Sequence, residues 1–462
     1  MRGEMDVEDV LTLGGITGTT VALLVLAFLI MLFDGFDLAA LSYAAPYIVT
    51  EWGIGSKAAL GIAFSASLVG MLVGAPVFGL LADRHGRKLV IVSCCVLMGC
   101  ATLAVTTVSS LAPLLALRFL AGIGMGGVAP CLIALTAEFA PSDRRATVVT
   151  VMYTGISAGA AIAGGLAAWA VPYAGWHLLF IVGGTAPLAF GLLAAIWMPE
   201  SLKFLVTRRP QDKRTRALAQ RLSRNQIDPG VTLIVRDVVE DGGRARPGLF
   251  PRQLFLGRLA FVTPLLWASK ISILMAYYCV TSWLPTLLTA LKLPIDQAAT
   301  ASVAFQVGGA LGGLALSQWI DRRGMSAVSM FFAFGIPGVC SIGYVAHAGA
   351  MLLLPVSFMA GFCVMGVQYG LNAISAMVYP TSLRTYGVGW STAVSRAGAI
   401  AGPMLGAASL ALGLPTELAI AAAALPLAAG ALASFFLWRT VAGTTAPAFP
   451  TLVARVAGPA EH

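Results

Sequence analysis

The sequence predicts an all-α polytopic membrane protein in which twelve transmembrane helices form two pseudo-symmetric six-helix bundles. Its 462 residues are 58% hydrophobic and 11% charged, with a mean hydropathy of +0.87, whereas soluble domains carry about 25% charged residues. Apolar runs of about 20 residues, the length that crosses about 30 Å of hydrocarbon, recur along the chain. Related motifs also recur in its two halves.

The apolar runs fall into two sets of six. They are continuous and lack the alternation of a barrel strand, which favours helices as the spanning elements. In the first half they lie near 20–49, 57–82, 88–108, 111–139, 146–171 and 176–198. In the second half they lie near 258–290, 297–320, 325–346, 350–378, 386–412 and 416–438.

These runs divide the chain into four parts. A six-helix bundle is expected over 1–198, a cytoplasmic connecting loop over 199–257, a second bundle over 258–440, and a cytoplasmic tail over 441–462. Short amphipathic helices are expected in the loop, for example in "QDKRTRALAQRLSR" (211–224). A solvated linker explains the loop equally well.

The positive charge is concentrated in the connecting loop. Between Glu200 and Arg258 there are 13 Lys+Arg and 6 Asp+Glu, which supply +7 of the net charge of +9. Such a loop is typical of the cytoplasmic side of a membrane protein and does not indicate nucleic-acid binding.

The short loops predict the same orientation. Loops after the second, fourth, eighth and tenth segments hold Arg84, Arg87, Lys88, Arg144, Arg145, Arg322, Arg323 and Arg384. The short loops on the other side hold only Lys57 and Lys292. The positive-inside rule therefore places both termini in the cytoplasm.

Residue patterns of an enzyme or a metal site are absent from the sequence. The seven cysteines fall inside apolar runs, with neither zinc-ligand spacing nor a disulfide framework. The four histidines are scattered, and no nucleophile–base set accompanies them. We expect no enzymatic activity, cofactor or metal, and a monomeric protein.

The two halves carry an internal repeat. "LLADRHGRK" (80–88) matches "QWIDRRGMS" (318–326) at an offset of 238 residues, and "GAAIAGG" (159–165) matches "AGAIAGP" (397–403) at the same offset. Two like halves around a central cavity can expose it alternately to the two sides of the membrane.

Two aspartates interrupt the first apolar segment. Asp34 and Asp37 lie in "LVLAFLIMLFDGFDLAALSYAAPYIV" (24–49), where an Asp costs about 2.5–3.5 kcal/mol on insertion scales. Their i,i+3 spacing places both on one helix face, where mutual repulsion and desolvation favour proton uptake. Gly35 lets another helix or a ligand approach. We expect a reversible proton site; a structural pair capped by an arginine is the alternative.

Arg118 is the expected partner of a first-helix aspartate, because it lies about two turns inside the fourth segment. A coupling pair that changes during transport and a static salt bridge are both compatible with it. Gly122, Gly124, Gly126 and Gly127 follow it and predict a thin helix face for close packing.

Two further cations lie deep in the second half. Lys270 is about twelve residues into the seventh segment and Arg396 about ten into the eleventh. With Arg118 they outnumber the two aspartates by one, which favours an anionic substrate: Arg binds a carboxylate bidentately and Lys as a point charge. Lys270 could instead extend toward a membrane interface.

Aromatic and amide side chains occur where a cavity would be lined. The candidates for binding an apolar substrate body are Tyr153, Tyr277, Tyr278, Trp283, Gln306, Gln368, Tyr369 and Asn372. Such residues in membrane helices are more often packing or interfacial residues than ligand contacts. Together with the excess cation they favour a small carboxylate with an apolar body.

Charged residues in the short loops predict a gate on the cytoplasmic face. In the first copy Gly79 permits close helix contact, Asp83 caps a neighbouring helix, and Glu138 pairs with Arg144 or Arg145; a plain surface ion pair is the alternative for Glu138. The complete set is Gly79, Asp83, Arg84, Gly86, Arg87, Glu138, Arg144, Asp321, Arg322, Gly324 and Arg384. Such a network would stabilise the state closed on that face.

These motifs resemble the major facilitator superfamily over nearly the whole chain. The resemblance rests on Gly79-x3-Asp83-Arg84-x-Gly86-Arg87-Lys88, its second copy at 321–324, the Arg118 glycine helix and "MPESLKFL" (198–205). Asp34-Gly35-x-Asp37 further resembles the first-helix signature of the aromatic acid/proton symporters, transporters of benzoate, 4-hydroxybenzoate or protocatechuate.

The resemblance implies the major facilitator fold and proton-coupled import of an aromatic acid into a bacterium across its inner membrane. It assigns functional roles to Asp34, Asp37, Arg118, Glu138, the Asp83 loop, Arg384 and Arg396, whereas Lys270 is not part of the family pattern. We expect a secondary symporter for a small organic, aromatic carboxylate. A proton-coupled exporter of drugs or metabolites is the nearest rival, and a solute receptor would bind without accumulating its ligand.

Overall fold

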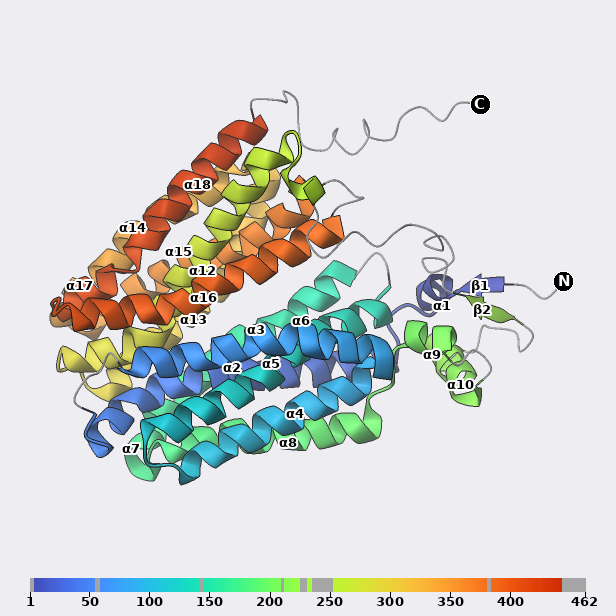
Figure 1. Cartoon of the computed structure of the whole chain (residues 1–462), viewed down its shortest axis with the longest axis horizontal. Coiled ribbons are helices and arrows are strands. Elements are labelled where there is room, and N and C mark those ends of the chain that lie inside the picture. The colour runs from blue at the N-terminus through green and yellow to red at the C-terminus, as the bar shows by residue number, and fades with distance from the viewer. Residues whose placement is uncertain are drawn as a thin grey trace. The chain divides into compact units, whose positions relative to one another are not determined.

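The computed structural model describes residues 4–54, 59–141, 145–208, 212–224, 231–234, 252–379 and 384–442, and over these it is almost entirely helical (Figure 1). It divides into two compact units. Unit 1 comprises Met1–Ile54 and Ile62–Pro247, and unit 2 comprises Gly55–Gly61 and Gly248–His462.

Each unit is built on six long helices. Those of unit 1 are α2 (Gly18–Glu51), α3 (Ala59–His85), α4 (Arg87–Ala104), α5 (Leu111–Phe139), α6 (Arg145–Trp169) and α8 (His177–Trp197). Those of unit 2 are α12 (Leu259–Ala290), α13 (Ile295–Arg323), α14 (Ser326–Val345), α15 (Ala350–Val378), α16 (Arg384–Ala411) and α18 (Ala424–Ala442). Short helices adjoin them: η1 (Val105–Thr107), α7 (Val171–Ala174), η2 (Arg252–Phe255), η3 (Ala346–Ala348) and α17 (Thr416–Ala421).

The helices agree with the predicted segments to within four residues at every boundary but one: the last segment, predicted from 416, begins with the short helix α17, and α18 starts at Ala424. In the described part of the chain, eleven segments are long and apolar enough to cross a membrane. The remaining long helix, α16, has 28 residues, roughly 42 Å at 1.5 Å per residue. It is less apolar because it carries Ser391, Thr392, Ser395 and Arg396. The predicted twelve-helix fold is therefore confirmed, with one helix that is more polar than the others.

The internal repeat is visible in the backbone. Gly86 after α3 has φ +96° and Gly324 after α13 has φ +65°, conformations that favour glycine. Each amide closes the preceding helix: Gly86 N–H donates to the Ala82 carbonyl at 3.0 Å, and Gly324 N–H to the Ile320 carbonyl at 2.8 Å. The four residues match at the offset of 238 predicted from the sequence, so the two motifs end their helices alike.

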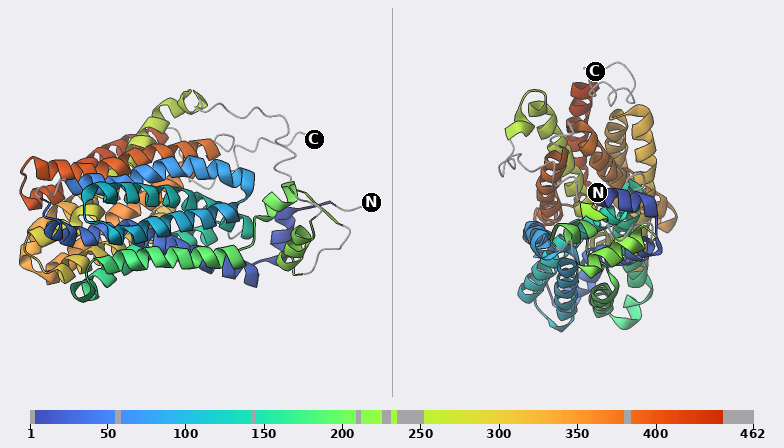
Figure 2. Two further views of the ribbon diagram at one scale, coloured as in Figure 1. Left: turned by 60° about the horizontal axis from the view of Figure 1, so that its bottom comes forward. Right: turned by 90° about the vertical axis from the view of Figure 1, so that its right-hand side faces the viewer.

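Within unit 1, α2 packs against α6 and α8, and α4 packs between α5 and α8 (Figure 2). Within unit 2, α13 packs against α15, while α12 lies against α16 and α18. Most of these helices are apolar enough to cross a membrane, as expected where one face of a helix packs on its neighbours and the other faces lipid.

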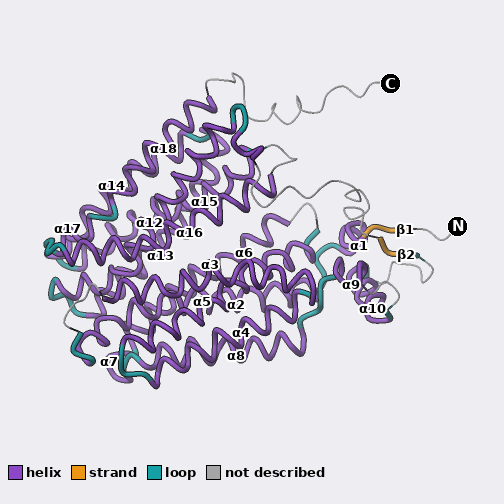
Figure 3. Tube along the Cα trace, in the orientation of Figure 1, coloured by secondary structure: helices purple, strands orange, loops and turns teal. Residues whose placement is uncertain are grey.

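The N-terminal segment and the connecting loop form a small cap at one end of unit 1. Strand β1 (Glu4–Asp6) pairs in parallel with β2 (Thr232–Ile234) of the loop, and these are the strands among the described residues (Figure 3). Helices α1 (Val7–Gly14), α9 (Leu202–Arg208) and α10 (Lys213–Leu222) complete the cap. The short helices expected in the loop are present, but its pairing with the N-terminus was not anticipated.

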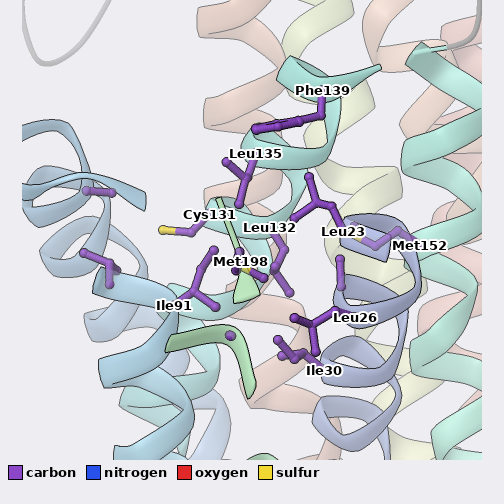
Figure 4. Close-up of a cluster of buried hydrophobic side chains, with 14 of the residues drawn as sticks. Leu23, Leu26, Ile30, Ile91, Cys131, Leu132, Leu135, Phe139, Met152 and Met198 are labelled. Carbon is purple, nitrogen blue, oxygen red and sulfur yellow. The ribbon is translucent and has the colours of Figure 1, made fainter. Parts of the chain in front are cut away.

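The cap shares the hydrophobic core of unit 1. Val10 of α1 and Leu222 of α10 are buried in one cluster with α2 residues such as Leu23 and Leu26. Figure 4 shows the part of this cluster between α2, α4, α5 and α6. The described loop residues are therefore packed against unit 1, and a solvated linker is wrong for them.

We predict that Val10→Asp detaches the cap without unfolding the transmembrane helices. Val10 is fully buried, and burying an unpaired carboxylate is strongly unfavourable. Trypsin should then cleave α10 on the order of tenfold faster than in the wild type, because local opening controls access. Asp9→Asn, on the exposed side of α1, is the matched control. Equal cleavage of both variants would contradict the packing of α1 on α10.

Candidate functional site

The two aspartates of α2 are buried, Asp34 being 1% exposed and Asp37 0%. Gly35 between them lies against α6, since a Cβ at Gly35 would be 2.1 Å from the Ile156 carbonyl oxygen. The close helix approach expected at Gly35 is confirmed. Any larger residue would push α6 away from the acidic pair.

Arg118 of α5 forms a buried, bidentate ion pair with Asp37. Its Nη1 donates to Asp37 Oδ1 at 3.0 Å, and its Nη2 to Oδ2 at 2.8 Å. Nη2 also donates to the Asp37 main-chain carbonyl at 3.2 Å. Arg118 is only 1% exposed. The partner predicted for Arg118 is thus found, and it is the second aspartate of the pair.

Neighbouring hydroxyls fix the ion pair in place. Thr102 of α4 donates its Oγ1 proton to Asp37 Oδ1 at 2.7 Å. Arg118 Nε donates to Ser67 Oγ of α3 at 3.1 Å, and the guanidinium lies 6.0 Å from the Phe180 ring centroid. Four helices of unit 1 therefore contribute to one polar cluster, and charge-assisted hydrogen bonds of this kind are stronger than neutral ones.

The acidic pair thus lies in the bundle interior, with Asp37 bound to Arg118 and Asp34 buried one helical turn before it. Enclosing such charges in a low-dielectric interior is costly unless they are compensated.

The deep cations of unit 2 lie on α12 and α16. Lys270 is 3% exposed, and its Nζ donates to Ser391 Oγ of α16 at 3.2 Å. Arg396, further along α16, is half-buried. Lys270 is therefore held inside unit 2, and the alternative in which it extends to a membrane interface is wrong.

The aromatic and amide candidates have different surroundings. Tyr277 is buried and its ring centroid lies 5.0 Å from that of Tyr278. Tyr369 is half-buried and packs over Gly313 of α13. Tyr153 is half-buried against the core cluster of unit 1, Gln368 is half-buried, and Asn372 is exposed. Trp283 and Gln306 are buried, and Trp283 Nε1 donates to the Pro403 carbonyl at 2.8 Å.

A second ionic cluster lies where α3 joins α4. Arg87 pairs with Glu138 of α5, and Ser201 Oγ donates to the other carboxylate oxygen of Glu138. Glu200 accepts hydrogen bonds from the main-chain N–H groups of Arg87 at 2.9 Å, Lys88 at 3.3 Å and Ser201 at 2.9 Å. Glu200 therefore caps the N-terminus of α4 from a distant part of the sequence.

This cluster corrects parts of the predicted gate. Glu138 pairs with Arg87 and Ser201; its expected partners, Arg144 and the side chain of Arg145, lie outside the described residues. The side chain that caps α4 is Glu200; Asp83 and Arg84 are exposed, and no cap or ion pair of Asp83 is found among the described residues. A Cβ at Gly79 would meet no described atom within 4 Å, so close packing does not require glycine there.

The other gate candidates divide into described and undescribed positions. Gly86 and Gly324 end α3 and α13 as described above. Arg322 is exposed. Arg144 and the side chains of Asp321 and Arg384 lie outside the described residues.

Sequence reasoning missed five residues of these clusters. Ser67, Thr102 and Ser391 are hydroxyl residues in apolar helices, and nothing in their local sequence separates them from packing residues. Glu200 and Ser201 lie in "MPESLKFL", one of the motifs on which the family resemblance rests. The sequence signal for Glu200 and Ser201 is the abrupt change from the apolar segment 176–198 to a carboxylate.

Sequence comparisons place the chain among transporters. The family model for the Major Facilitator Superfamily matches residues 27–403. A gallate transporter of Pseudomonas putida is 36% identical over 93% of this chain and 94% of its own length. The 4-hydroxybenzoate transporter PcaK of Acinetobacter baylyi is 35% identical over 89% of both chains. A 3-(3-hydroxy-phenyl)propionate transporter of Escherichia coli is 33% identical over 89% of this chain and 92% of its own.

Solved structures share the fold at low sequence identity. A bacterial homologue of the lysosomal transporter Spinster matches with a TM-score of 0.70 and 16% identity, covering 93% of this chain and 99% of that one. The xylose transporter XylE of E. coli matches with a TM-score of 0.67 and 15% identity, covering 91% and 99%.

We predict that Asp37→Asn lowers the free energy of unfolding by about 3–5 kcal/mol, because it leaves the buried Arg118 without its carboxylate. Asp34→Asn, three residues away on the same helix, leaves the Asp37–Arg118 pair intact and should lower it by less. The double variant Asp37→Asn/Arg118→Met should recover most of the loss. Denaturant titration of the purified protein in detergent measures all three. Equal losses in the two aspartate variants would contradict the assignment of the ion pair.

Proposed function

Because this chain belongs to the major facilitator superfamily, we propose that it imports a small aromatic carboxylate together with protons. The family consists of multi-pass membrane transporters and not enzymes. Relatives named as transporters of gallate, 4-hydroxybenzoate and 3-(3-hydroxy-phenyl)propionate match about nine-tenths of the chain. Their shared substrate chemistry, a carboxylate on an aromatic body, supports the proposed substrate class.

The observation that carries the proton coupling is the buried Asp37–Arg118 ion pair beside Asp34. Protonating Asp37 would leave the Arg118 charge buried without its carboxylate. Protonating Asp34 leaves that ion pair intact. We therefore assign proton carriage to Asp34, and to Asp37 and Arg118 the task of holding a fixed charge beside it.

The transport cycle follows from charge neutralisation. From the outside, Asp34 takes up a proton while the substrate carboxylate binds a cation of unit 2. Both events remove buried net charge, which lowers the free energy of the closed state. The site then opens to the other side, where Asp34 releases its proton and the substrate dissociates. Alternating access of this kind is general among transporters built from repeated halves.

The proposed substrate-binding residues are Arg396, Lys270, Arg118, Tyr153, Tyr277, Tyr278, Gln368, Tyr369 and Asn372. The cations would fix the carboxylate and the aromatic residues would pack against the ring. The exposure of Asn372 and the packing of Tyr153 into the core make these two the weakest members.

We further propose that the chain is a monomer in the inner membrane of a bacterium, with the cap of unit 1 and both termini in the cytoplasm. The charge of the short loops supports this orientation. The Arg87–Glu138 pair and the Glu200 cap lie within unit 1. They would hold α4, α5 and the Ser201 segment together while the cytoplasmic side opens.

Asp34→Asn should abolish proton-driven accumulation while preserving exchange. An amide cannot carry the proton, yet it leaves Asp37, Arg118 and the substrate cations unchanged. In proteoliposomes with an inward proton gradient, uptake of labelled aromatic acid should fall on the order of a hundredfold, the loss expected when a two-unit pH difference no longer drives entry. Counterflow of labelled against unlabelled acid should continue. Undiminished gradient-driven accumulation in Asp34→Asn would refute its coupling role.

The direction of coupling distinguishes import from export. Protein should be inserted in one orientation, with the cap shown by protease accessibility to face the vesicle lumen, and the proton gradient imposed in either direction. A symporter accumulates acid when protons flow inward with it, whereas an exporter exchanges the acid against protons. Accumulation only with the reversed gradient would replace the proposed importer with an exporter.

A further inference from the structure

Lys270 is a charged residue in the middle of a membrane-spanning helix. It lies eleven residues beyond Leu259, the first residue of α12, and therefore roughly 17 Å along the helix axis. It is 3% exposed. A charge at this depth is expensive, and such residues generally face a ligand pathway or a partner of opposite charge.

The contact that holds Lys270 is a neutral one. Lys270 Nζ donates to Ser391 Oγ at 3.2 Å, and Ser391 donates its own proton to the Val388 carbonyl at 2.9 Å. The hydroxyl proton is thus directed away, and an oxygen lone pair faces the ammonium. In the described part of the chain no carboxylate forms an ion pair with Lys270. Two of its three N–H donors therefore have no acceptor there.

The buried cations Arg118 and Lys270 differ in the partners that they contact. Arg118 has a bidentate carboxylate partner in Asp37, whereas Lys270 has one hydroxyl. In this structure the protein itself compensates the charge of Arg118, whereas the charge of Lys270 meets no carboxylate among the described residues.

The helices around Lys270 hold it rigidly. A Cβ at Gly398 would lie 2.0 Å from the Ile271 carbonyl oxygen, and one at Gly402 would lie 2.5 Å from that of Met275. The backbones of α12 and α16 are therefore in direct contact, which fixes Ser391 relative to Lys270. A prepositioned ammonium loses little conformational entropy when a ligand binds.

We propose that Lys270, positioned by Ser391, binds the carboxylate of the transported aromatic acid. The inference rests on the proposed function. It deepens that function by placing the carboxylate-binding site at Lys270 of α12, a residue that is not part of the pattern of the aromatic acid/proton symporters. Tyr277 follows Lys270 by seven residues, or two helical turns, and so lies on the same face of α12. It is buried, and the aromatic ring of the substrate would extend along this face toward it.

The test compares each acid with its uncharged amide. Gallate, 4-hydroxybenzoate and 3-(3-hydroxyphenyl)propionate, each beside the matching carboxamide, are titrated into the full-length protein in lipid nanodiscs. The wild type should bind at least one acid on the order of tenfold or more tightly than its amide, since an ionic hydrogen bond of about 1.5–3 kcal/mol is lost in the amide. Lys270→Met should lose that preference, with affinity for the amide changed less than about threefold.

Three variants complete the test. Ser391→Ala should weaken binding of the acid several-fold more than binding of the amide, because the ammonium loses its positioning contact. Lys270→Arg should retain part of the preference for the acid. Lys292→Met, which removes an exposed lysine beyond the end of α12, should behave as the wild type. Thermal unfolding of each variant shows whether it is folded.

The outcomes separate the two proposals. A wild type that binds an acid and a folded Lys270→Met that keeps the full preference for it would overturn the carboxylate site alone. Should Lys270→Met not fold, an unchanged preference in Ser391→Ala would overturn it. A wild type that binds none of the acids would overturn the proposed function and the carboxylate site with it.

Discussion

The ion pair between Asp37 and Arg118 is the interaction on which the rest of unit 1 depends. Neither charge could be enclosed among apolar helices alone, because each would lose its hydration without compensation. Together with Thr102 and Ser67 they satisfy one another and link α2, α3, α4 and α5. The glycine contacts of α2 with α6 and of α5 with its neighbours are the geometric counterpart, since they bring the backbones close enough for these side chains to meet.

Most of the fold could be predicted from the sequence because lipid imposes one requirement on every spanning segment. A helix must satisfy its own backbone and be apolar outside, so hydropathy alone located the boundaries, and even α16 was found despite its polar residues. The cap of unit 1 is different. Its β1–β2 pairing joins residues more than 200 positions apart through three main-chain pairs, and no side-chain pattern in strands that short specifies a partner.

The charged residues of the candidate site could be predicted from the sequence. Asp34, Asp37, Arg118 and Lys270 stood out because charges are rare and costly in apolar segments. Their partners were not predictable, since a hydroxyl such as Thr102 or Ser391 can satisfy itself on its own helix and therefore leaves no trace in hydropathy. The same limit applies to Glu138. Its partner in the structure, Arg87, belongs to a neighbouring helix, and only the packing of α4 on α5 brings the two together.

Unit 1 buries two aspartates and unit 2 buries a lysine. This difference in the sign of the buried charge suggests how the transport of two solutes becomes coupled. In the proposed cycle, unit 1 takes up one proton at Asp34, and unit 2 binds one carboxylate at Lys270. Loading only one solute leaves the other unit charged, and enclosing that charge would be unfavourable. A protein arranged in this way needs no direct contact between the proton and the substrate. In the proposed cycle, the cost of burying uncompensated charge favours the closed state with both solutes bound over the closed state with only one of them.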